Sequence, residues 1–182
     1  MQANIAIGLI ELSSIARGVE SLDAMCKMAG ISVETASPIS KGKYVIIVSG
    51  PVGEVESSLA KGAEMAGKEL ISRRIIRNIH KGVLEALDKK IKIENLEAVG
   101  MIETKEALSA VFAADAALKA ASVRIIEVNT GRGIGGKGYF TVTGEVGAVR
   151  TAVSAGVNAI GEEAIVNRIV IPNAHKDLGK VL

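Results

Sequence analysis

The chain has 182 residues, a formal net charge of +2 and a single cysteine, Cys26. Hydrophobic residues make up 48% of it, whereas aromatic residues make up 2% and tryptophan is absent. The small charge without aromatic platforms argues against a nucleic-acid binder, and one cysteine excludes an intramolecular disulfide or a cysteine metal cluster. No apolar run reaches the roughly 18 residues of a membrane span, and no signal peptide is recognisable, so we expect a cytoplasmic protein.

The first half alternates strand-like and helix-like segments. Continuous apolar or β-branched runs indicate strands, whereas Ser13 or Ser14 is suitable as the N-cap of a helix and Gly30 as its C-cap. The predicted elements are a strand over 4–11, a helix that follows Ser13 or Ser14 and ends at Gly30, strands over 31–36 and 44–48 separated by a loop over 37–43, a helix over 54–67, a strand over 71–76 and a short helix over 82–87.

The second half repeats the first. Residues 23–30 (DAMCKMAG) return as 115–122 (DAALKAAS), so that aspartate and lysine recur together 92 positions later. Residues 50–55 recur 94 positions later, and His80-Lys81 recurs as His175-Lys176 after 95 positions. Residues 6–11 (AIGLIE) also return as 98–103 (AVGMIE) at the offset of 92, and two matching blocks at one offset indicate an internal duplication.

The first length change between the repeats falls in one loop. This loop is 37–43 in the first half and 130–137 in the second. The flanking elements keep their register, as expected for a functional loop on a rigid scaffold.

Each half therefore predicts the order β-α-β-β-α-β, the ferredoxin-like pattern of the α/β (α+β) class. We expect two tandem domains, each a four-stranded antiparallel sheet with its helices on one face. The predicted limits are 4–87 for the first domain, 88–97 for a linker and 98–182 for the second domain. The open sheet edge and the uncovered sheet face favour oligomerisation.

Four motifs together resemble the domain of bacterial microcompartment (BMC) shell proteins. They are Gly-Leu-Ile-Glu from Gly8, the segment 23–30, Gly-Lys-Tyr from Gly42 and Gly-Pro-Val-Gly-Glu-Val from Gly50. Two copies in one chain resemble the tandem-domain shell proteins, above all the propanediol-utilisation type, whose homotrimers mimic a hexamer.

The resemblance implies a structural protein without enzymatic activity. It would tile with neighbouring hexameric shell proteins, could contact encapsulated enzymes, and would let metabolites or electrons pass through a central pore. Its place would be the microcompartment shell in the cytoplasm, with no nucleic-acid or membrane partner.

The resemblance also implies two sets of site residues. In the family the lysine of the first helix lies at the edge of the tile, and a lysine stem suits contact along such an edge. The candidate edge residues are Lys27 and Lys119, with Asp23 and Asp115 beside them. The family's pore is lined by the loop between the second and third strands; the matching residues are Ile39, Ser40, Lys41, Gly42, Gly133, Ile134, Gly135 and Gly136.

The glycine-rich stretch 131–138 (GRGIGGKG) has a second interpretation as a phosphate-binding loop. A P-loop requires serine or threonine after its lysine and then a helix. Here Gly138 follows Lys137, and 139–143 is strand-like. The dinucleotide-binding fingerprint fails for the same reason, so we do not expect a nucleotide site.

The propanediol-type trimers carry a cysteine in the first-half pore loop, where three copies hold an iron–sulfur (4Fe-4S) cluster. Ser40 occupies the matching position here, and serine is a poor ligand for such a cluster compared with thiolate. We expect Cys26 to be buried on the apolar face of its helix. The sequence therefore predicts no metal and no cofactor, and leaves open whether Ser40 is natural or an engineered replacement.

Other function classes remain open. Tandem ferredoxin-like domains also form trimeric regulators that bind small molecules between subunits, and a cluster on the trimer axis would make a redox carrier. Catalysis has little support, because the histidines recur at equivalent positions, as do Glu11 and Glu103. We expect these glutamates to cap or to form ion pairs.

Overall fold

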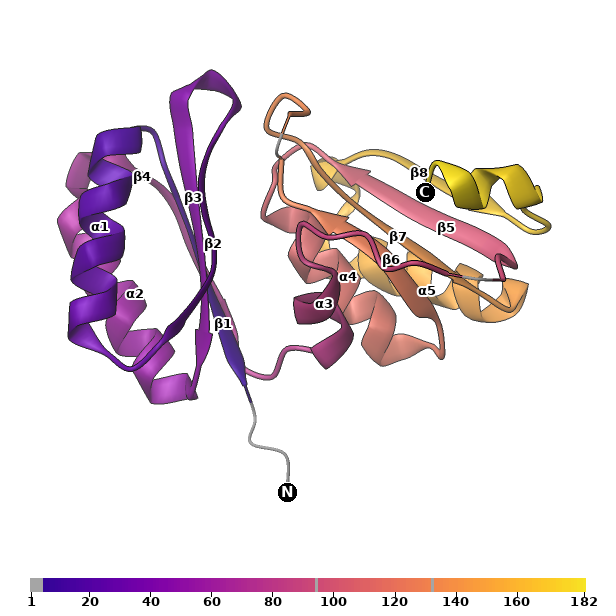
Figure 1. The fold of residues 1–182 in the computed structure, drawn as a ribbon, viewed down its shortest axis with the longest axis horizontal. Helices are drawn as coiled ribbons and strands as arrows, with labels where there is room; N and C mark the ends of the chain where they lie inside the picture. Colours follow the sequence, from indigo (N-terminus) through magenta and orange to yellow (C-terminus); the bar gives the residue numbers. More distant parts are fainter. Residues whose placement is uncertain (1–4, 94, 132) are drawn as a thin grey trace. The chain divides into compact units, whose positions relative to one another are not determined.

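The computed structural model describes residues 5–93, 95–131 and 133–182 (Figure 1). Asn4, the predicted start of the first strand and domain, lies outside them, as do Glu94 of the predicted linker and Arg132 of the glycine-rich loop. Contacts divide the chain into two compact units, the first ending at Ile79 and the second beginning at His80.

The two units share the order β-α-β-β-α-β, and the second has an additional helix at each end. In the first unit the elements are β1 (Ala6–Leu12), α1 (Ile15–Met28), β2 (Ser32–Ile39), η1 (Ser40–Gly42), β3 (Lys43–Gly50), α2 (Val52–Ala66), η2 (Gly67–Glu69) and β4 (Leu70–Ile76). In the second they are α3 (Lys81–Ala86), β5 (Ala98–Thr104), α4 (Ser109–Ala120), β6 (Arg124–Asn129), β7 (Gly138–Gly144), α5 (Val146–Ile160), η3 (Glu162–Ala164), β8 (Ile165–Ile171) and η4 (Lys176–Lys180).

Each unit is one antiparallel sheet with its two long helices on one face (Figure 1). The strand orders are β2-β3-β1-β4 and β6-β7-β5-β8, so β2 and β6 are equivalent edge strands. This arrangement confirms the predicted fold class. None of the described helices combines the length and apolarity that a bilayer-spanning segment needs.

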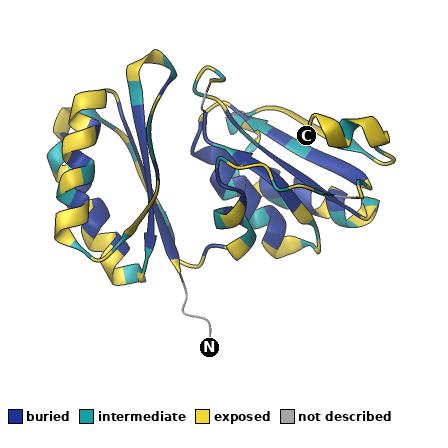
Figure 2. Cartoon of the chain, viewed as in Figure 1, coloured by how far each residue is buried: buried dark blue, intermediate teal, exposed yellow. Residues whose placement is uncertain are grey.

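The core of each unit lies between its sheet and its helices. Figure 2 shows the central strands buried, in keeping with the continuous apolar runs of β1 and β3. Gly8 of β1 allows α2 to approach closely, since a Cβ there would lie 2.8 Å from a methyl carbon of Val55. Gly100 has the same role in the second unit, 2.7 Å from Val149. Close backbone approach thus brings the helices onto the sheets in a chain that has few aromatic side chains.

The structure corrects two details of the sequence analysis. The loop predicted over 37–43 is only three residues long, because β2 continues to pair with β3 as far as Ile39 opposite Lys43. Pro38 is tolerated there because β2 is an edge strand. Cys26 is exposed rather than buried, because Met25 fills the inward position of α1 instead.

The segment after the first repeat packs on the second unit. The predicted helix near 82–87 is present as α3, which lies against β6 and α4. Residues 88–91 then follow the outer edge of β6, where the backbone N–H groups of Asp88 and Ile91 donate to the carbonyls of Val128 and Ile126, both at 2.7 Å. The domain limits at 87 and 97 therefore stay a prediction, since by packing the second unit begins at His80.

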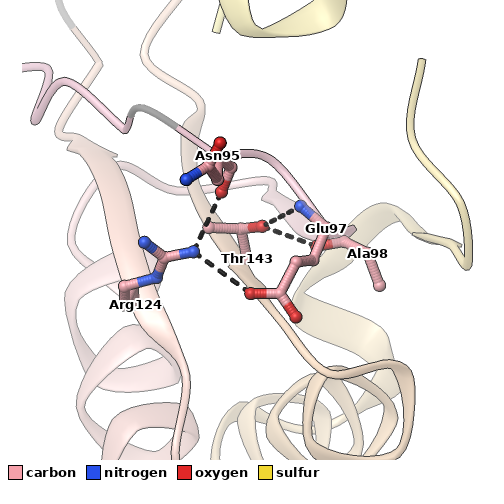
Figure 3. Close-up of polar contacts among 5 residues, drawn as sticks. All are labelled: Asn95, Glu97, Ala98, Arg124 and Thr143. Carbon is pink, nitrogen blue, oxygen red and sulfur yellow. Dashed lines mark hydrogen bonds and ion pairs between the residues drawn. The ribbon is translucent and has the colours of Figure 1, made fainter. Parts of the chain in front are cut away.

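The end of this segment is also held by the second unit (Figure 3). Arg124 of β6 donates to the carbonyl oxygen of Asn95 at 2.9 Å and pairs with Glu97 at 3.3 Å. The hydroxyl of Thr143 accepts the N–H of Glu97 and donates to the carbonyl of Ala98. The described residues of the predicted linker are thus held by hydrogen bonds along the edge of the second sheet.

Candidate functional site

The candidate pore residues lie in two equivalent connections between neighbouring strands. The first loop, residues 40–42, is a tight turn in which Lys41 and Gly42 have φ of 64° and 71°. Lys41 is a non-glycine residue in the left-handed region, which is uncommon outside such turns. Its side chain and Gly42 are exposed, Ser40 is half-buried, and Ile39 is buried at the end of β2.

The second loop, residues 130–137, depends on glycine. Gly133, Gly135 and Gly136 all have positive φ, between 74° and 82°, a conformation that costs glycine little. Ile134 between them is half-buried. At the base of the loop, the carboxylate of Asp88 accepts the N–H of Thr130 at 2.9 Å and its hydroxyl at 2.7 Å. A strand follows the loop, as expected, and not the helix that a nucleotide-binding loop would need.

A lysine–glutamate ion pair anchors each loop to the central strand of its unit. Lys43 Nζ lies 2.8 Å from Glu11 Oε1, and Lys137 Nζ lies 2.7 Å from Glu103 Oε1. The sequence analysis expected the two glutamates to cap or pair but did not name these lysines. The signal was present, because Gly42-Lys43 recurs as Gly136-Lys137 at the same offset as the flanking strand.

The second loop has a further polar contact at its base. Tyr139, the second residue of β7, donates its hydroxyl proton to Glu127 of β6 at 2.8 Å. Burial, followed by the hydrogen bond and the charge of Glu127, raises the pKa of Tyr139 to about 12. The tyrosine therefore stays neutral throughout the physiological range.

The four candidate edge residues form two ion pairs within their own helices. Asp23 and Lys27 of α1 are 2.6 Å apart, as are Asp115 and Lys119 of α4. The surroundings differ, since the Asp23 side chain is 61% exposed and that of Asp115 is 10% exposed. Asp115 also accepts the backbone N–H of His80 at 2.8 Å. The two helices thus contain the same Asp–Lys ion pair, but the pair on α4 is more buried than the pair on α1.

The described residues contain no cluster of three or more histidine, cysteine, aspartate or glutamate side chains that could hold a metal ion. Cys26 lies near the end of α1 that leads into β2, whereas Ser40 lies at the far end of that strand. The cysteine is therefore separated from the first loop by the length of β2. His80 and His175 each accept an N–H two residues further on, which makes them local caps.

Comparisons with known proteins agree on one family. The BMC domain model matches twice, over residues 6–79 and 98–174. The chain is 38% identical to the bacterial microcompartment shell protein PduT of Citrobacter freundii over 174 residues, 95% of each protein. It is also 42% identical over 89 residues to the major carboxysome shell protein CsoS1A of Halothiobacillus neapolitanus, 47% of this chain and 87% of that one.

The fold has a near counterpart among solved structures. The crystal structure of a microcompartment protein from Desulfitobacterium hafniense DCB superposes with a TM-score of 0.92 at 39% identity. The match covers 98% of this chain and 99% of the other.

Proposed function

The chain belongs to the BMC-domain family of bacterial microcompartment shell proteins, and we propose that three copies of it form a pseudohexameric tile of the shell. The observation that carries this proposal is the pair of equivalent units in one chain, with identical strand orders. Three chains supply six such units, the number that a six-sided tile requires. The role is structural and not enzymatic.

Passage through the tile would occur where the loops of three copies meet. Ser40 and Lys41 would bring hydroxyl groups and positive charge to a threefold axis, and the glycines of the second loop would bring backbone N–H groups. Such groups suit polar or anionic metabolites. The anchoring of Lys43 and Lys137 by glutamates supports this arrangement, because it fixes the base of each loop.

Lateral contacts with neighbouring tiles, including hexameric shell proteins, would involve the exposed Lys27 and Lys119. Their ion pairs keep the ammonium groups at the helix surface, where long stems can extend along an edge. We propose no iron–sulfur cluster at the first loop, because Ser40 replaces the thiolate that such a cluster needs.

Native mass spectrometry together with negative-stain microscopy of one sample tests the function. We expect a trimer of about 56 kDa, three times the 18.8 kDa chain, and flat hexagonal arrays. A discrete trimer without arrays that a metabolite stabilises would instead support a ligand-binding regulator. A monomer or dimer would contradict the tile and the pore together. A brown protein with visible absorbance after anaerobic purification would contradict the absence of a cluster.

A further inference from the structure

Helices α1 and α4 are equivalent by repeat, but they differ in how their outer surfaces are covered. Val111 of α4 is fully buried, whereas Val19, its counterpart on α1, is 53% exposed. Leu118 of α4 is buried, and its counterpart Cys26 is exposed. The outer apolar surface of α4 is thus covered by another part of the chain, whereas the equivalent surface of α1 is exposed.

The cover of α4 is the segment 80–87. Val83, Ala86 and Leu87 of this segment are buried. A Cβ at position 82 would lie 3.3 Å from Leu118 Cδ1, so the segment lies directly on the helix. The N–H of His80 donates to Asp115, and Leu87 forms a bridge to β6 beside it.

The tail of the chain repeats this segment. Residues 175–182 (HKDLGKVL) match 80–87 (HKGVLEAL) at an offset of 95. The local structure is also repeated, since His175 Nδ1 accepts the N–H of Asp177 at 3.3 Å as His80 Nδ1 accepts that of Gly82 at 3.1 Å. Both segments therefore begin with a histidine-capped helical turn.

The tail is less well covered than its counterpart. No residue of η4 is buried, and Val181 is 65% exposed, whereas its counterpart Ala86 is fully buried. In the single chain Leu178 and Leu182 are only half-buried, the tail lines a shallow hollow with apolar residues of 91–96, and Lys90 Nζ donates to the carbonyl of Val181 at 2.8 Å. The same molecule thus contains a tail whose apolar side chains are only partly covered and, on α1, an exposed counterpart of the surface that covers residues 80–87.

We propose that residues 175–182 of one copy dock on α1 and β2 of a second copy, as residues 80–87 dock on α4 and β6 of their own chain. The proposal rests on the homotrimer above and names its interface. Leu178, Val181 and Leu182 would cover Val19 and Cys26 of the second copy.

The polar contacts of the docked tail follow from the same equivalence. Asp23 would accept the N–H of His175 and keep Lys27, just as Asp115 accepts from His80 while it pairs with Lys119. β2 is an edge strand like β6, and its Val33 is exposed where the matching Ile125 is buried. Each copy then offers one tail and one acceptor surface, a heterologous contact that forms a ring when the rotation closes.

Asp177→Cys gives a direct test, because position 177 matches position 82 and Cys26 matches Leu118. The new thiol would lie beside Cys26 of the next copy, within the reach of a disulfide. After mild oxidation, we expect non-reducing gels to show covalent dimers and trimers that dithiothreitol returns to monomers. A disulfide within one chain, or no disulfide, would overturn the proposal.

Two control variants test whether the disulfide joins position 177 to Cys26 of the next copy. The double variant C26A/D177C keeps the new thiol but removes its partner, and we expect no ladder from it. In K176C the new thiol takes the place of Lys81, whose side chain points to solvent in the docked segment, and we expect at most a trace of ladder. A ladder of equal strength from either control would count against the proposed register.

A second variant separates this interface from the proposed function. Leu178→Asp places a charge where Val83 is buried, so we expect loss of the trimer with unchanged far-ultraviolet circular dichroism. If L178D stays fully trimeric and D177C forms no ladder, the docking is wrong although the tile stands. If the unmodified protein is not a trimer, the proposed function itself fails.

Discussion

Tyr139 and Glu127 form the clearest titratable pair at the base of the second loop. The raised pKa of Tyr139 means that the neutral phenol is favoured in the folded protein. The corresponding contribution to stability is present below pH 10, the ordinary pKa of tyrosine, and is lost as the pH rises from about 10 to about 12. The contribution of the pair to stability is therefore constant across the physiological range and changes only under alkaline conditions.

Tyrosinate absorbance measures this shift directly. The chain has two tyrosines, so Tyr44→Phe leaves Tyr139 as the single reporter. We expect a titration midpoint near 12, and a lower midpoint in Y44F/E127Q because the charge of Glu127 is gone. A midpoint near 10 in the folded Y44F protein would show that neither the burial of Tyr139 nor its hydrogen bond to Glu127 persists in solution.

Glu145 is a residue-scale test of helix capping. Its carboxylate accepts the backbone N–H of Ala148 at 3.0 Å, and hydrogen bonds from Gly147 and Ala148 lower its pKa. We expect Glu145→Ala to reduce the Tm at neutral pH. Because the pKa is lowered on folding, the benefit exists at neutral pH and disappears as the pH falls through the folded-state pKa.

A matched variant shows whether the effect belongs to the cap. Glu64→Ala removes an exposed carboxylate that pairs with Lys61 near the end of α2, and we expect a smaller change in Tm. Equal losses in the two variants at neutral pH, or a loss in E145A that persists in acid, would point to a cause other than capping.

Contacts between near neighbours are the ones that a sequence can indicate directly. The Asp23–Lys27 and Asp115–Lys119 pairs join residues four apart on a helix, a spacing that brings side chains together without tertiary structure. The loop anchors were missed because Lys43 and Glu11 are 32 positions apart and meet only when the sheet forms. Cys26 was placed wrongly because helical periodicity could not decide between it and Met25 as the inward residue.

At the scale of the elements, close packing of α1 on α2 makes one glycine of α2 sensitive to substitution by alanine, whereas another glycine of the same helix tolerates it. A Cβ on Gly62 would lie 2.6 Å from the Met25 side chain of α1, whereas one on Gly53 would meet nothing within 4 Å. We expect Gly62→Ala to lower the free energy of unfolding by about 1–3 kcal/mol through overpacking. Gly53→Ala should raise it by about 0.5–1 kcal/mol through helix propensity.

Chemical denaturation of the two variants against the unmodified protein measures both values. The pair is matched, because both changes add one methyl group to the same helix. A neutral G62A would mean that α1 and α2 shift apart without cost, and the packing described for the first unit would need revision.

Element order was predictable because the apolar runs and caps are local features of the sequence. The ends of the elements were harder to predict. β2 extends through Pro38 to Ile39 because its backbone pairs there with β3, which is distant contact information that the local sequence does not carry. The packing of α3 could not be predicted either. The sequence of 81–86 indicates a helix, but nothing local in it says which repeat the helix covers.

At the scale of the whole molecule, the two lysines allow assembly and folding to be separated. The exposed Asp23–Lys27 pair contributes about 0.2–0.5 kcal/mol, and Asp115 keeps the hydrogen bond from His80 when Lys119 is truncated, so neither loss should unfold the protein. We expect K27A/K119A to remain a trimer by native mass spectrometry and to form no sheets by electron microscopy. K27D/K119D should behave in the same way.

Lys61→Ala is the control for this experiment, because it removes an equally simple surface lysine from α2. Its sheets should be unchanged. Sheets that persist in K27A/K119A would contradict the edge role of both lysines, and a loss of the trimer would assign them to the subunit interface.

The ordered segment 80–97 also decides where this gene can be divided. A fragment that begins at codon 98 would encode the second repeat with the carbonyl groups of Ile126 and Val128 deprived of their donors, and bare strand edges of this kind invite aggregation. A fragment that begins at codon 80 would carry its own edge protection. Chimeras that recombine repeats from different shell genes should therefore cross over between Ile79 and His80, even though the repeated sequence resumes only near Ala98.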